Sequence, residues 1–311
     1  TNTALEQMVD TSDEWITTRT GIKERRILKP TSLGTSFMAI AAARELIQKK
    51  DLDVSTIDLV IVSTTTPDMP VSSTAAFVAT EIGATNAFGY DLQGACSGFL
   101  YGMSAAAAHI TSGRYQKVLL IGADTMSSII DYTDRTTCVI FGDGAGAVLF
   151  EPNEEGLGLQ DEVLRVDGKG REFLKIEAGG SMLPASSETV TARKHFLHQE
   201  GRPVFKFAVS NMTAAIEQVL NQNDLTKNDI DYVIAHQANK RILDAIAKNL
   251  DLNYEQMLVN IERYGNTTAA TLPLLLWDYE SKLKKNQKLL FTAFGGGFTW
   301  GATYLTWAYN T

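Results

Sequence analysis

Two stretches, AARELIQKKDLDVSTIDLVIVSTTT (42–66) and AAIEQVLNQNDLTKNDIDYVIAHQA (214–238), repeat one local pattern. Each begins as an amphipathic helix, continues through a polar turn and the dipeptide Ile-Asp, and ends in a short strand rich in β-branched residues. The two Ile-Asp pairs stand at 57–58 and 230–231. The repetition predicts one helix-turn-strand unit in each half of the chain.

The match continues on the C-terminal side of both stretches. A charge-poor segment, DLQGACSGFLYGMSAAAAHITSGRY (91–115), precedes the strand KVLLIGAD (117–124), and a helix from about residue 268 precedes the strand KLLFTAFGG (288–296). The interval between these two strands is nearly the same as that between the Ile-Asp pairs. Order and spacing predict two similar α/β halves related by pseudo-twofold symmetry. The alternative is that helix-turn-strand units simply recur, as they do in any α/β protein.

The charge-poor segment has no Asp, Glu, Lys or Arg between Asp91 and Arg114, although 21% of the chain is charged. It is long enough to span a bilayer, but Gln93, His109 and several Ser, Thr and Gly residues suit lipid poorly. A helix that is apolar on every side is otherwise buried in protein. We therefore expect a core helix and no membrane association.

Composition restricts the class of protein. With 311 residues and 44% hydrophobic residues, the chain can bury a large core. A net charge of -8 and a pI near 5.1 argue against nucleic acid as a partner. Cys96 and Cys138 form neither a disulfide framework nor a CxxC pair, which favours a reducing, cytoplasmic compartment. No secretion leader is recognisable, although Thr1 is not an initiator Met.

The predicted organisation has three parts: an N-terminal half at 1–160, a connecting excursion at 161–203 and a C-terminal half at 204–311. The middle of the chain is rich in Gly and charge and carries His195 and His198 in the sequence HFLH. This spacing could bind a metal ion, but isolated surface histidines are far commoner. We expect no metal site.

Three side chains fall where α/β proteins place their chemistry, beyond strand ends and at helix N-termini. Cys96 is expected in the first turn of its helix, where free N–H groups and the helix dipole lower a thiol pKa. His236 follows the strand DYVIA, so we expect it at a cleft. Asn266 precedes a helix. The shift that superimposes the strands at 117 and 288 takes Cys96 to Thr267, so the two halves are expected to present equivalent loop-to-helix junctions.

Each of these residues also has an ordinary structural interpretation. A cysteine in an apolar helix is usually part of the core, and the strand context of Cys138 favours that interpretation. An asparagine before a helix is often a cap or turn residue, and His109 is expected to be a satisfied structural residue. The glycine-rich segments FGDGAGA (141–147) and FGGGFTWGA (294–302) lack the spacing and placement of phosphate loops.

Six segments carry a resemblance across essentially the whole chain. In order they are DTSDEWITTRTGI (10–22), GACSGF (94–99), DRTTCVIFGDGAGA (134–147), HQANKRI (236–242), GNTTAA (265–270) and AFGGGFTWGA (293–302). This series resembles β-ketoacyl-acyl-carrier-protein synthase III of the thiolase superfamily. The resemblance implies a thiolase-like, five-layered αβαβα fold of two duplicated halves, and it places the family's catalytic Cys, His and Asn at Cys96, His236 and Asn266.

The sequence departs from the family pattern at two places. Family members begin with a strand upstream of the TN segment, so we expect this chain to continue before Thr1. Gln93 and Gly94 stand where many relatives carry small apolar residues, which is expected to alter the wall of the acyl pocket.

The resemblance implies a decarboxylating Claisen condensation. A short acyl-CoA, with acetyl-CoA as the expected primer, reacts with malonyl-acyl carrier protein to give 3-oxoacyl-acyl carrier protein and begin fatty acid biosynthesis. Cys96 takes the acyl group as a thioester. Backbone N–H groups of Cys96 and Gly296 hold the oxyanion, while His236 and Asn266 bind the enolate oxygen. Coenzyme A enters as a substrate thioester, and no metal or redox cofactor is implied.

The resemblance also implies binding residues and a partner subunit. Trp15, Arg19 and Arg135 are expected to hold the CoA nucleotide, and Phe294 to line the malonyl side. The residues expected to dock the acidic carrier protein are Lys206, Gln237, Ala238, Asn239, Lys240, Arg241 and Lys248. Asn249 stands where some relatives have a basic residue, which weakens this patch. The family is homodimeric, and the charge-poor central helices suit an apolar interface.

Three alternatives remain open from the sequence. A cysteine peptidase would share the Cys-His-Asn order of a papain-like triad, but the Cys-Gly-x-Cys-Trp context of that class is absent. A non-catalytic thiolase-fold subunit would have no need for all three polar residues. A relative that condenses longer or different acyl-CoAs would keep the same chemistry. The sequence does not fix the primer, since one methylene is worth only about 1 to 3 kcal/mol.

Overall fold

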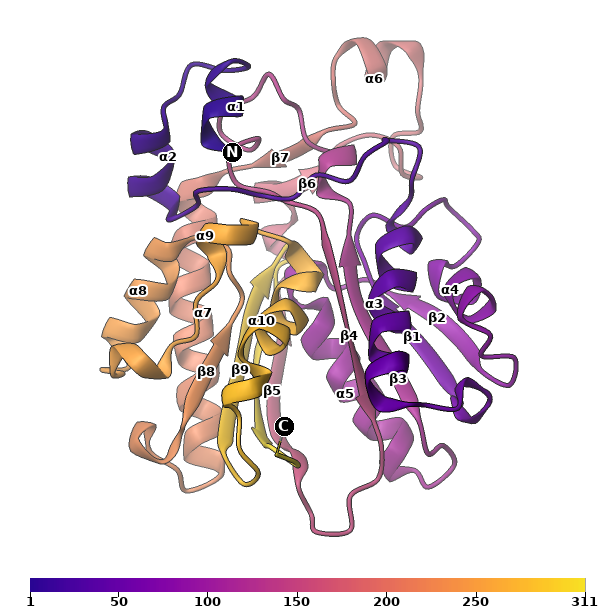
Figure 1. Ribbon diagram of the computed structural model, residues 1–311. Coiled ribbons are helices and arrows are strands. Elements are labelled where there is room, and N and C mark those ends of the chain that lie inside the picture. The colour runs from indigo at the N-terminus through magenta and orange to yellow at the C-terminus, as the bar shows by residue number, and fades with distance from the viewer. Residues whose placement is uncertain (311) are drawn as a thin grey trace.

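The computed structural model describes residues 1–310 and has five layers (Figure 1). Two four-stranded sheets enclose a pair of central helices, and other helices cover the outer face of each sheet. This arrangement confirms the α/β fold class and the two similar halves predicted from the repeat.

The first sheet has the order β2-β1-β3-β4, with β4 antiparallel to β3 and the other pairs parallel. Every residue of β1 and β3 is buried, as is typical of parallel strands covered on both faces. Helices α3 and α4 pack on the outer face and α5 on the inner face. The bounds are β1 (Leu59–Ser63), β2 (Phe88–Leu92), β3 (Val118–Asp124), β4 (Gly144–Phe150), α3 (Thr35–Lys50), α4 (Thr74–Ile82) and α5 (Gly98–Thr111).

The second sheet has the order β5-β10-β9-β8. Strands β8 and β9 are parallel, and β10 is antiparallel to both of its neighbours. Strand β5 spans the boundary expected at residue 160 and pairs with β10. Helix α7 covers the outer face with α8 beside it, and α10 lies inside. The bounds are β5 (Gly158–Val166), β8 (Tyr232–Ala235), β9 (Lys288–Gly295), β10 (Thr299–Thr306), α7 (Gly201–Gln222), α8 (Lys240–Asn249) and α10 (Thr271–Tyr279).

The remaining elements gather at one end of the molecule, above the sheets in Figure 1. They are α1 (Asn2–Glu6), α2 (Asp13–Thr20), β6 (Leu174–Ile176), α6 (Ser187–Thr191), β7 (Leu197–Gln199) and α9 (Ile261–Tyr264). The HFLH histidines do not form a pair here: Nε2 of His195 lies 2.9 Å from Oγ1 of Thr189, and Nε2 of His198 lies 3.9 Å from Oε1 of Glu200. Among residues 1–310, no group of three or more His, Cys, Asp or Glu side chains is placed to hold a metal ion.

Short 3₁₀ turns show the repeat most clearly. Turn η1 (Val54–Thr56) matches η5 (Lys227–Asp229), and η2 (Ala95–Ser97) matches η7 (Thr268–Ala270), with the same interval that separates the two Ile-Asp pairs. Cys96 therefore corresponds to Ala269, and the predicted match with Thr267 is wrong. The interval between the strands does not apply at the junctions, because the segment from the start of α10 to the start of β9 is shorter than the segment from the start of α5 to the start of β3.

The charge-poor helix α5 lies in the central core, as predicted. Phe99 and Leu100 of α5 are fully buried and share one apolar cluster with Leu272 of α10 and Phe291 of β9. Across residues 1–310, none of the helices is both long and apolar enough to cross a membrane. Because this cluster contains residues of both halves, packing of the core fixes the two halves relative to each other.

Candidate active site

Cys96 occupies η2, immediately before α5, and its side chain is only 7% exposed. The N-terminus of α5 favours a thiolate. Burial opposes this effect and, with the negative charge of Asp124, raises the pKa of the Cys96 thiol to about 12. The predicted lowering of this pKa is therefore wrong. The thiol is neutral at pH 7, so acylation must include removal of its proton.

The backbone N–H of Cys96 faces the end of β9. A Cβ atom on Gly295 would lie 2.6 Å from the Cys96 nitrogen, so only glycine allows this approach. Within the described part of the chain, no acceptor oxygen is found for this N–H. Gly296 follows directly, and its Cβ would lie 3.6 Å from the Cβ of Ala95. The two expected oxyanion donors thus belong to adjoining segments.

His236 comes directly after β8, and its backbone N–H donates to the carbonyl of Thr292 at 2.8 Å. The side chain is 1% exposed, so it is more deeply buried than the expected position at a cleft. Burial lowers the pKa of His236 to about 3, which keeps the imidazole neutral. Its Nδ1 lies 3.2 Å from Oγ1 of Thr271. Donation by that hydroxyl would leave the ring proton on Nε2.

Asn266 lies between α9 and η7, and backbone bonds fix it on both sides. Its N–H donates to the carbonyl of Ile140 at 3.0 Å, and its carbonyl accepts from the N–H of Gly142 at 3.0 Å. The side-chain Oδ1 accepts from the N–H of Thr268 at 2.9 Å. Asn266 is thus a turn residue, as its ordinary interpretation predicted, but this turn leaves the Nδ2 hydrogens available to a ligand.

The segments that carry the three predicted catalytic residues adjoin one another: Asn266 and His236 bond to the first residues of η7 and α10, and η7 contacts η2, which carries Cys96. Turn η2 packs against η7 and against the end of β9, while η7 packs against the end of β3. The sequence interpretation missed Asp124, Thr271 and Gly295, which support this arrangement. The shift that superimposes the two predicted strands aligns Asp124 with Gly295, so the repeat contained a signal for two of them.

Cys138, by contrast, lies in a turn segment before β4 and not in the predicted strand. Its side chain is 1% exposed and packs with Ile22 and Phe141. Burial and nearby carboxylates raise the pKa of this thiol to about 11. No catalytic partner surrounds it in the described structure, which is consistent with its predicted core role.

The residues expected to bind the CoA nucleotide form one cluster around α2. The guanidinium carbon of Arg135 lies 4.9 Å from the ring centroid of Trp15, and that of Arg19 lies 5.4 Å from it. Arg135 also donates to the carbonyl of Asp10 at 2.8 Å. The cluster offers one aromatic face with two exposed cations beside it.

Phe294 lies on β9 next to Gly295 and is 4% exposed. Its ring centroid lies 4.7 Å from that of Phe298 and 6.5 Å from that of Trp300. The side chain is therefore packed among aromatic rings in the core of the second half.

The residues expected to dock the carrier protein do not all reach the surface. Lys206 on α7 and Arg241 and Lys248 on α8 are exposed, and Arg241 lies 5.7 Å from the ring of Phe205. A groove of about 520 Å³ lies beside them, lined by residues of α7 and by Asn249. These three cations form the exposed basic part of the predicted patch.

The loop before α8 is largely structural. Gln237 is 1% exposed, and its amide donates to the carbonyls of Ala235 and Leu258 at 2.9 and 3.2 Å, so the prediction that it docks the carrier is wrong. Asn239 caps α8, and its neighbour Ala238 is half-buried. Lys240 forms an ion pair of 2.6 Å with Asp244, which reduces its availability to a partner.

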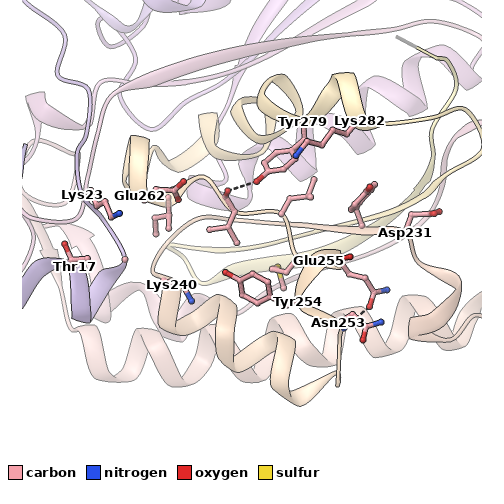
Figure 2. Close-up of a pocket in the computed structure, with 17 residues that line it drawn as sticks. Thr17, Lys23, Asp231, Lys240, Asn253, Tyr254, Glu255, Glu262, Tyr279 and Lys282 are labelled. Carbon is pink, nitrogen blue, oxygen red and sulfur yellow. Dashed lines mark hydrogen bonds between the residues drawn. The ribbon is translucent and has the colours of Figure 1, made fainter.

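A larger cavity of about 950 Å³ lies away from the thiol (Figure 2). Residues of α2 and α8 and the segment 253–262 line it, and the hydroxyl of Tyr279 donates to the carbonyl of Val259 there at 2.9 Å. Lysines and carboxylates alternate around its rim, including Lys23, Glu255 and Lys282. Neither Cys96, His236 nor Asn266 is among its lining residues, so this cavity is not the catalytic pocket.

Known proteins match this chain along its whole length. A model of 3-oxoacyl-(acyl-carrier-protein) synthase III matches residues 90–168, and the C-terminal model of the same protein matches residues 220–307. β-Ketoacyl-(acyl-carrier-protein) synthase III 2 of Bacteroides thetaiotaomicron is 54% identical over 100% of this chain and 92% of its own length.

Solved structures agree with this result. The synthase III of Thermus thermophilus has a TM-score of 0.92 and 41% identity, and that of Aquifex aeolicus a TM-score of 0.90 and 40% identity. Each match covers 99% of this chain and 95% of the other. The thiolase-like fold implied by the sequence segments is therefore confirmed.

Proposed function

The chain belongs to the 3-oxoacyl-(acyl-carrier-protein) synthase III family, and on that premise we propose that Cys96, His236 and Asn266 carry out its reaction. The enzyme is an acyltransferase that condenses an acyl group from acyl-CoA with malonyl-acyl carrier protein and so initiates fatty acid synthesis. The observation that carries the residue assignment is the Cys96 junction. At this junction the buried thiol of Cys96 lies at the N-terminus of α5, and the backbone N–H of Cys96 has no acceptor among the described residues.

In the first half-reaction, Sγ of Cys96 attacks the carbonyl carbon of acyl-CoA. A new C–S bond forms, the bond to the CoA sulfur breaks, and CoA leaves as a thiol with the proton lost by Cys96. The N–H groups of Cys96 and Gly296 donate to the oxygen of the tetrahedral intermediate. One such donor contributes about 3 kcal/mol to the transition state.

In the second half-reaction, the bond from the malonyl methylene carbon to its carboxylate breaks and carbon dioxide leaves. The electron pair forms an enolate, whose oxygen accepts hydrogen bonds from Nε2 of His236 and Nδ2 of Asn266. The enolate carbon then attacks the acyl carbonyl on Cys96. The C–S bond breaks, the 3-oxoacyl product leaves on its carrier, and Cys96 leaves as a thiolate that takes up a proton from solvent.

The contacts of His236 argue against a papain-like triad. In such a triad the Asn orients the His, which in turn keeps the Cys ionised. Here Nδ1 of His236 meets Thr271, while the side-chain oxygen of Asn266 is occupied by the N–H of Thr268. Two separate neutral donors, His236 and Asn266, suit an enolate better than a charge-transfer triad.

The binding residues support delivery of both substrates. Trp15 and the cations Arg19 and Arg135 present a stacking surface and charges for the CoA nucleotide. We assign carrier docking to Lys206, Arg241 and Lys248, since a protein with net charge -8 needs a local basic patch to meet an acidic partner.

We further propose a homodimer formed at the free edge of the first sheet. Among residues 1–310, β2 pairs only with β1, and an exposed strand edge favours pairing with a second copy. Phe88 at the start of β2 is 43% exposed, and its ring centroid lies 5.3 Å from that of Tyr115. Phe77 on the neighbouring helix α4 is 50% exposed. These apolar groups adjoin the edge and would be covered in a dimer.

A cytoplasmic location is consistent with the cysteines. Cys96 and Cys138 are both free thiols, and the proposed acyl transfer needs Cys96 in its reduced form. A reducing compartment provides that condition.

The residue roles can be tested by measuring the half-reactions separately. We expect His236→Ala and Asn266→Ala to retain transfer of a labelled acyl group to the protein and to lose release of carbon dioxide from the malonyl substrate. Cys96→Ala should lose acyl transfer and keep some decarboxylation. A folded His236→Ala variant that cannot be acylated but still decarboxylates would reverse the assigned roles. Assays across acetyl-, isobutyryl-, isovaleryl- and longer acyl-CoAs would then define the primer.

A further inference from the structure

Asp124 ends strand β3 and is completely buried. Its Oδ1 accepts hydrogen bonds from the loop after β1, including the N–H groups of Thr65 at 2.7 Å and Thr66 at 3.1 Å. Its Oδ2 accepts from Oγ1 of Thr268 and from the N–H of Ala269, the latter at 3.1 Å. One carboxylate therefore joins a loop of the first half to turn η7 of the second.

Thr268 connects Asp124 to Asn266, because it forms hydrogen bonds with both side chains. Its backbone φ is +51°, a left-handed conformation that costs energy for a residue with a branched side chain. In this conformation its N–H donates to Oδ1 of Asn266 at 2.9 Å. The bonds from Thr268 and Ala269 to Asp124 stabilise the strained turn, and the turn sets the orientation of the Asn266 amide.

We propose that Asp124 is a positioning residue for the decarboxylation step, acting through Thr268 on Asn266. The proposal rests on the function proposed above, because it assumes that Asn266 binds the enolate. Asp124 fixes the Asn266 oxygen against Thr268 so that the Nδ2 hydrogens are presented to the substrate. Misplacement of such a donor by about 1 Å can lower a rate roughly 100-fold.

The same carboxylate has an opposite effect on Cys96. Its negative charge disfavours the thiolate, and the other titratable group of the catalytic set, His236, is neutral. Removal of the charge should therefore make Cys96 easier to ionise while it weakens the support of Asn266. A residue that only stabilised the fold would not lower decarboxylation alone while it shifted the ionisation of Cys96.

The principal test is Asp124→Asn, which keeps the shape and removes the charge. We expect kcat for carbon dioxide release to fall about 100-fold with little change in KM for the malonyl substrate. Acyl transfer to Cys96 should stay within about threefold of the wild type. The rate of Cys96 alkylation by iodoacetamide should rise at a lower pH than in the wild type. Equal losses in both half-reactions, or no loss in decarboxylation, would overturn the proposal.

Two further variants decide the matter if Asp124→Asn does not fold. Thr268→Ala removes the hydroxyl that donates to Asp124, whereas Thr268→Ser keeps it. We expect decarboxylation to fall about tenfold in Thr268→Ala and to remain near the wild-type rate in Thr268→Ser. Equal rates in the two variants would contradict the pathway through Thr268.

Asn266→Ala separates failure of this inference from failure of the function itself. If Asn266→Ala abolishes decarboxylation while Asp124→Asn and Thr268→Ala do not change it, only the role of Asp124 is wrong. If Asn266→Ala decarboxylates normally, the proposed function fails at that residue and the inference falls with it.

Discussion

The two halves of the molecule place the same 3₁₀ turn before their central helices, η2 before α5 and η7 before α10, but different residues face the two turns. In the first half the turn carries Cys96, whose N–H faces Gly295 at the end of β9. In the second half the matching N–H, that of Ala269, donates to the carboxylate of Asp124 at the end of β3. Where one junction has a carboxylate bound to its N–H, the other has a glycine. A symmetric scaffold can therefore provide the proposed oxyanion site at the junction where glycine stands in place of the carboxylate.

A second pair of positions differs in the same manner. Ser63 and Gly98 in the first half match His236 and Thr271 in the second, at the same interval as the 3₁₀ turns. His236 meets Thr271 in a polar contact of 3.2 Å. A Cβ on Gly98 would lie 2.3 Å from Oγ of Ser63, and that hydroxyl has no partner among the described residues. In the proposed mechanism, the nucleophile thus belongs to one junction and the enolate donors to the other.

The largest effect should follow from removing the proposed nucleophile, Cys96. Acyl-CoA without malonyl substrate is expected to leave a covalent adduct on Cys96, and Cys96→Ala should abolish it completely. Intact-protein and peptide mass spectrometry would locate the adduct. Cys138→Ala is the matched control, because Cys138 is also a buried free thiol but lies outside both junctions. An adduct mapped to Cys138 would contradict the assignment of Cys96 as the acylated residue.

The glycine at the first junction should matter next most. In Gly295→Ala the new Cβ meets the Cys96 nitrogen at 2.6 Å, so the turn must shift and the oxyanion donor with it. We expect acyl transfer to fall about 100- to 1,000-fold, the usual cost of losing such a donor. Pre-steady-state acylation measures this directly.

Gly201→Ala serves as the control for that variant. Gly201 begins α7, outside the proposed site, and its Cβ would meet no atom within 4 Å. If Gly201→Ala slowed acylation as much as Gly295→Ala, the importance given to Gly295 would be contradicted.

At the second junction, Thr271→Val should lower decarboxylation about tenfold and leave acylation nearly unchanged. Valine keeps the shape but cannot donate to Nδ1 of His236, so the proton is no longer fixed on Nε2. Thr271→Ser should restore most of the rate because it keeps the hydroxyl. A loss of acylation in Thr271→Val would show that the two junctions are not chemically separate.

Charge reversal in Arg241→Glu should have a smaller effect, confined to delivery of the second substrate. We expect KM for the carrier-bound malonyl substrate to rise about fivefold, since a rim charge mainly influences association. KM for malonyl-CoA should not change. Lys284→Glu makes the same charge change on an exposed residue before β9, away from α8. If both variants raised the KM for the carrier-bound substrate equally, the effect would come from the total charge of the protein and not from docking at the basic patch.

The last prediction concerns stability, and not catalysis, at the two ends of the pH range. The folded pKa of His236 is about 3, against an ordinary value of 6.5, so the unfolded chain takes up a proton first as the pH falls. The contribution of His236 to the free energy of unfolding is fully present above pH 6.5. It decreases toward pH 3 by up to about 1.4 kcal/mol per pH unit.

Cys96 acts in the opposite direction. Its folded pKa is about 12 against an ordinary 9.0, so its contribution to stability is lost as the pH rises above 9.0.

The prediction for His236 can be tested by chemical denaturation between pH 4 and 7. The free energy of unfolding should fall less steeply with decreasing pH in His236→Ala than in the wild type. An unchanged slope would mean that His236 is not buried in its neutral form.

Local sequence predicted the elements and placed Cys96, His236 and Asn266 at helix starts and a strand end, because these boundaries are visible in hydrophobic periodicity; their catalytic roles come from the resemblance and stay proposals. It could not predict the pKa of Cys96, since the burial of the thiol and its proximity to the Asp124 charge arise only from tertiary packing. The resemblance places Gln237 in the carrier-docking set, but its buried amide donates to the carbonyls of Ala235 and Leu258 and so closes the loop after β8. The interval at the junctions differs from that at the strands because α10 is shorter than α5.

Strand β5 has a practical consequence for dividing the protein into two parts. It pairs with β10 from Gly158 opposite Thr306 to Val166 opposite Thr299, so it belongs to the second sheet. A chain cut in the exposed loop 152–156 leaves each fragment with one whole sheet, whereas a cut near residue 203 would leave β5 on the wrong fragment. A split version cut at the loop would carry Cys96 on one fragment and His236 with Asn266 on the other. Condensation activity would then report reassembly of the two fragments.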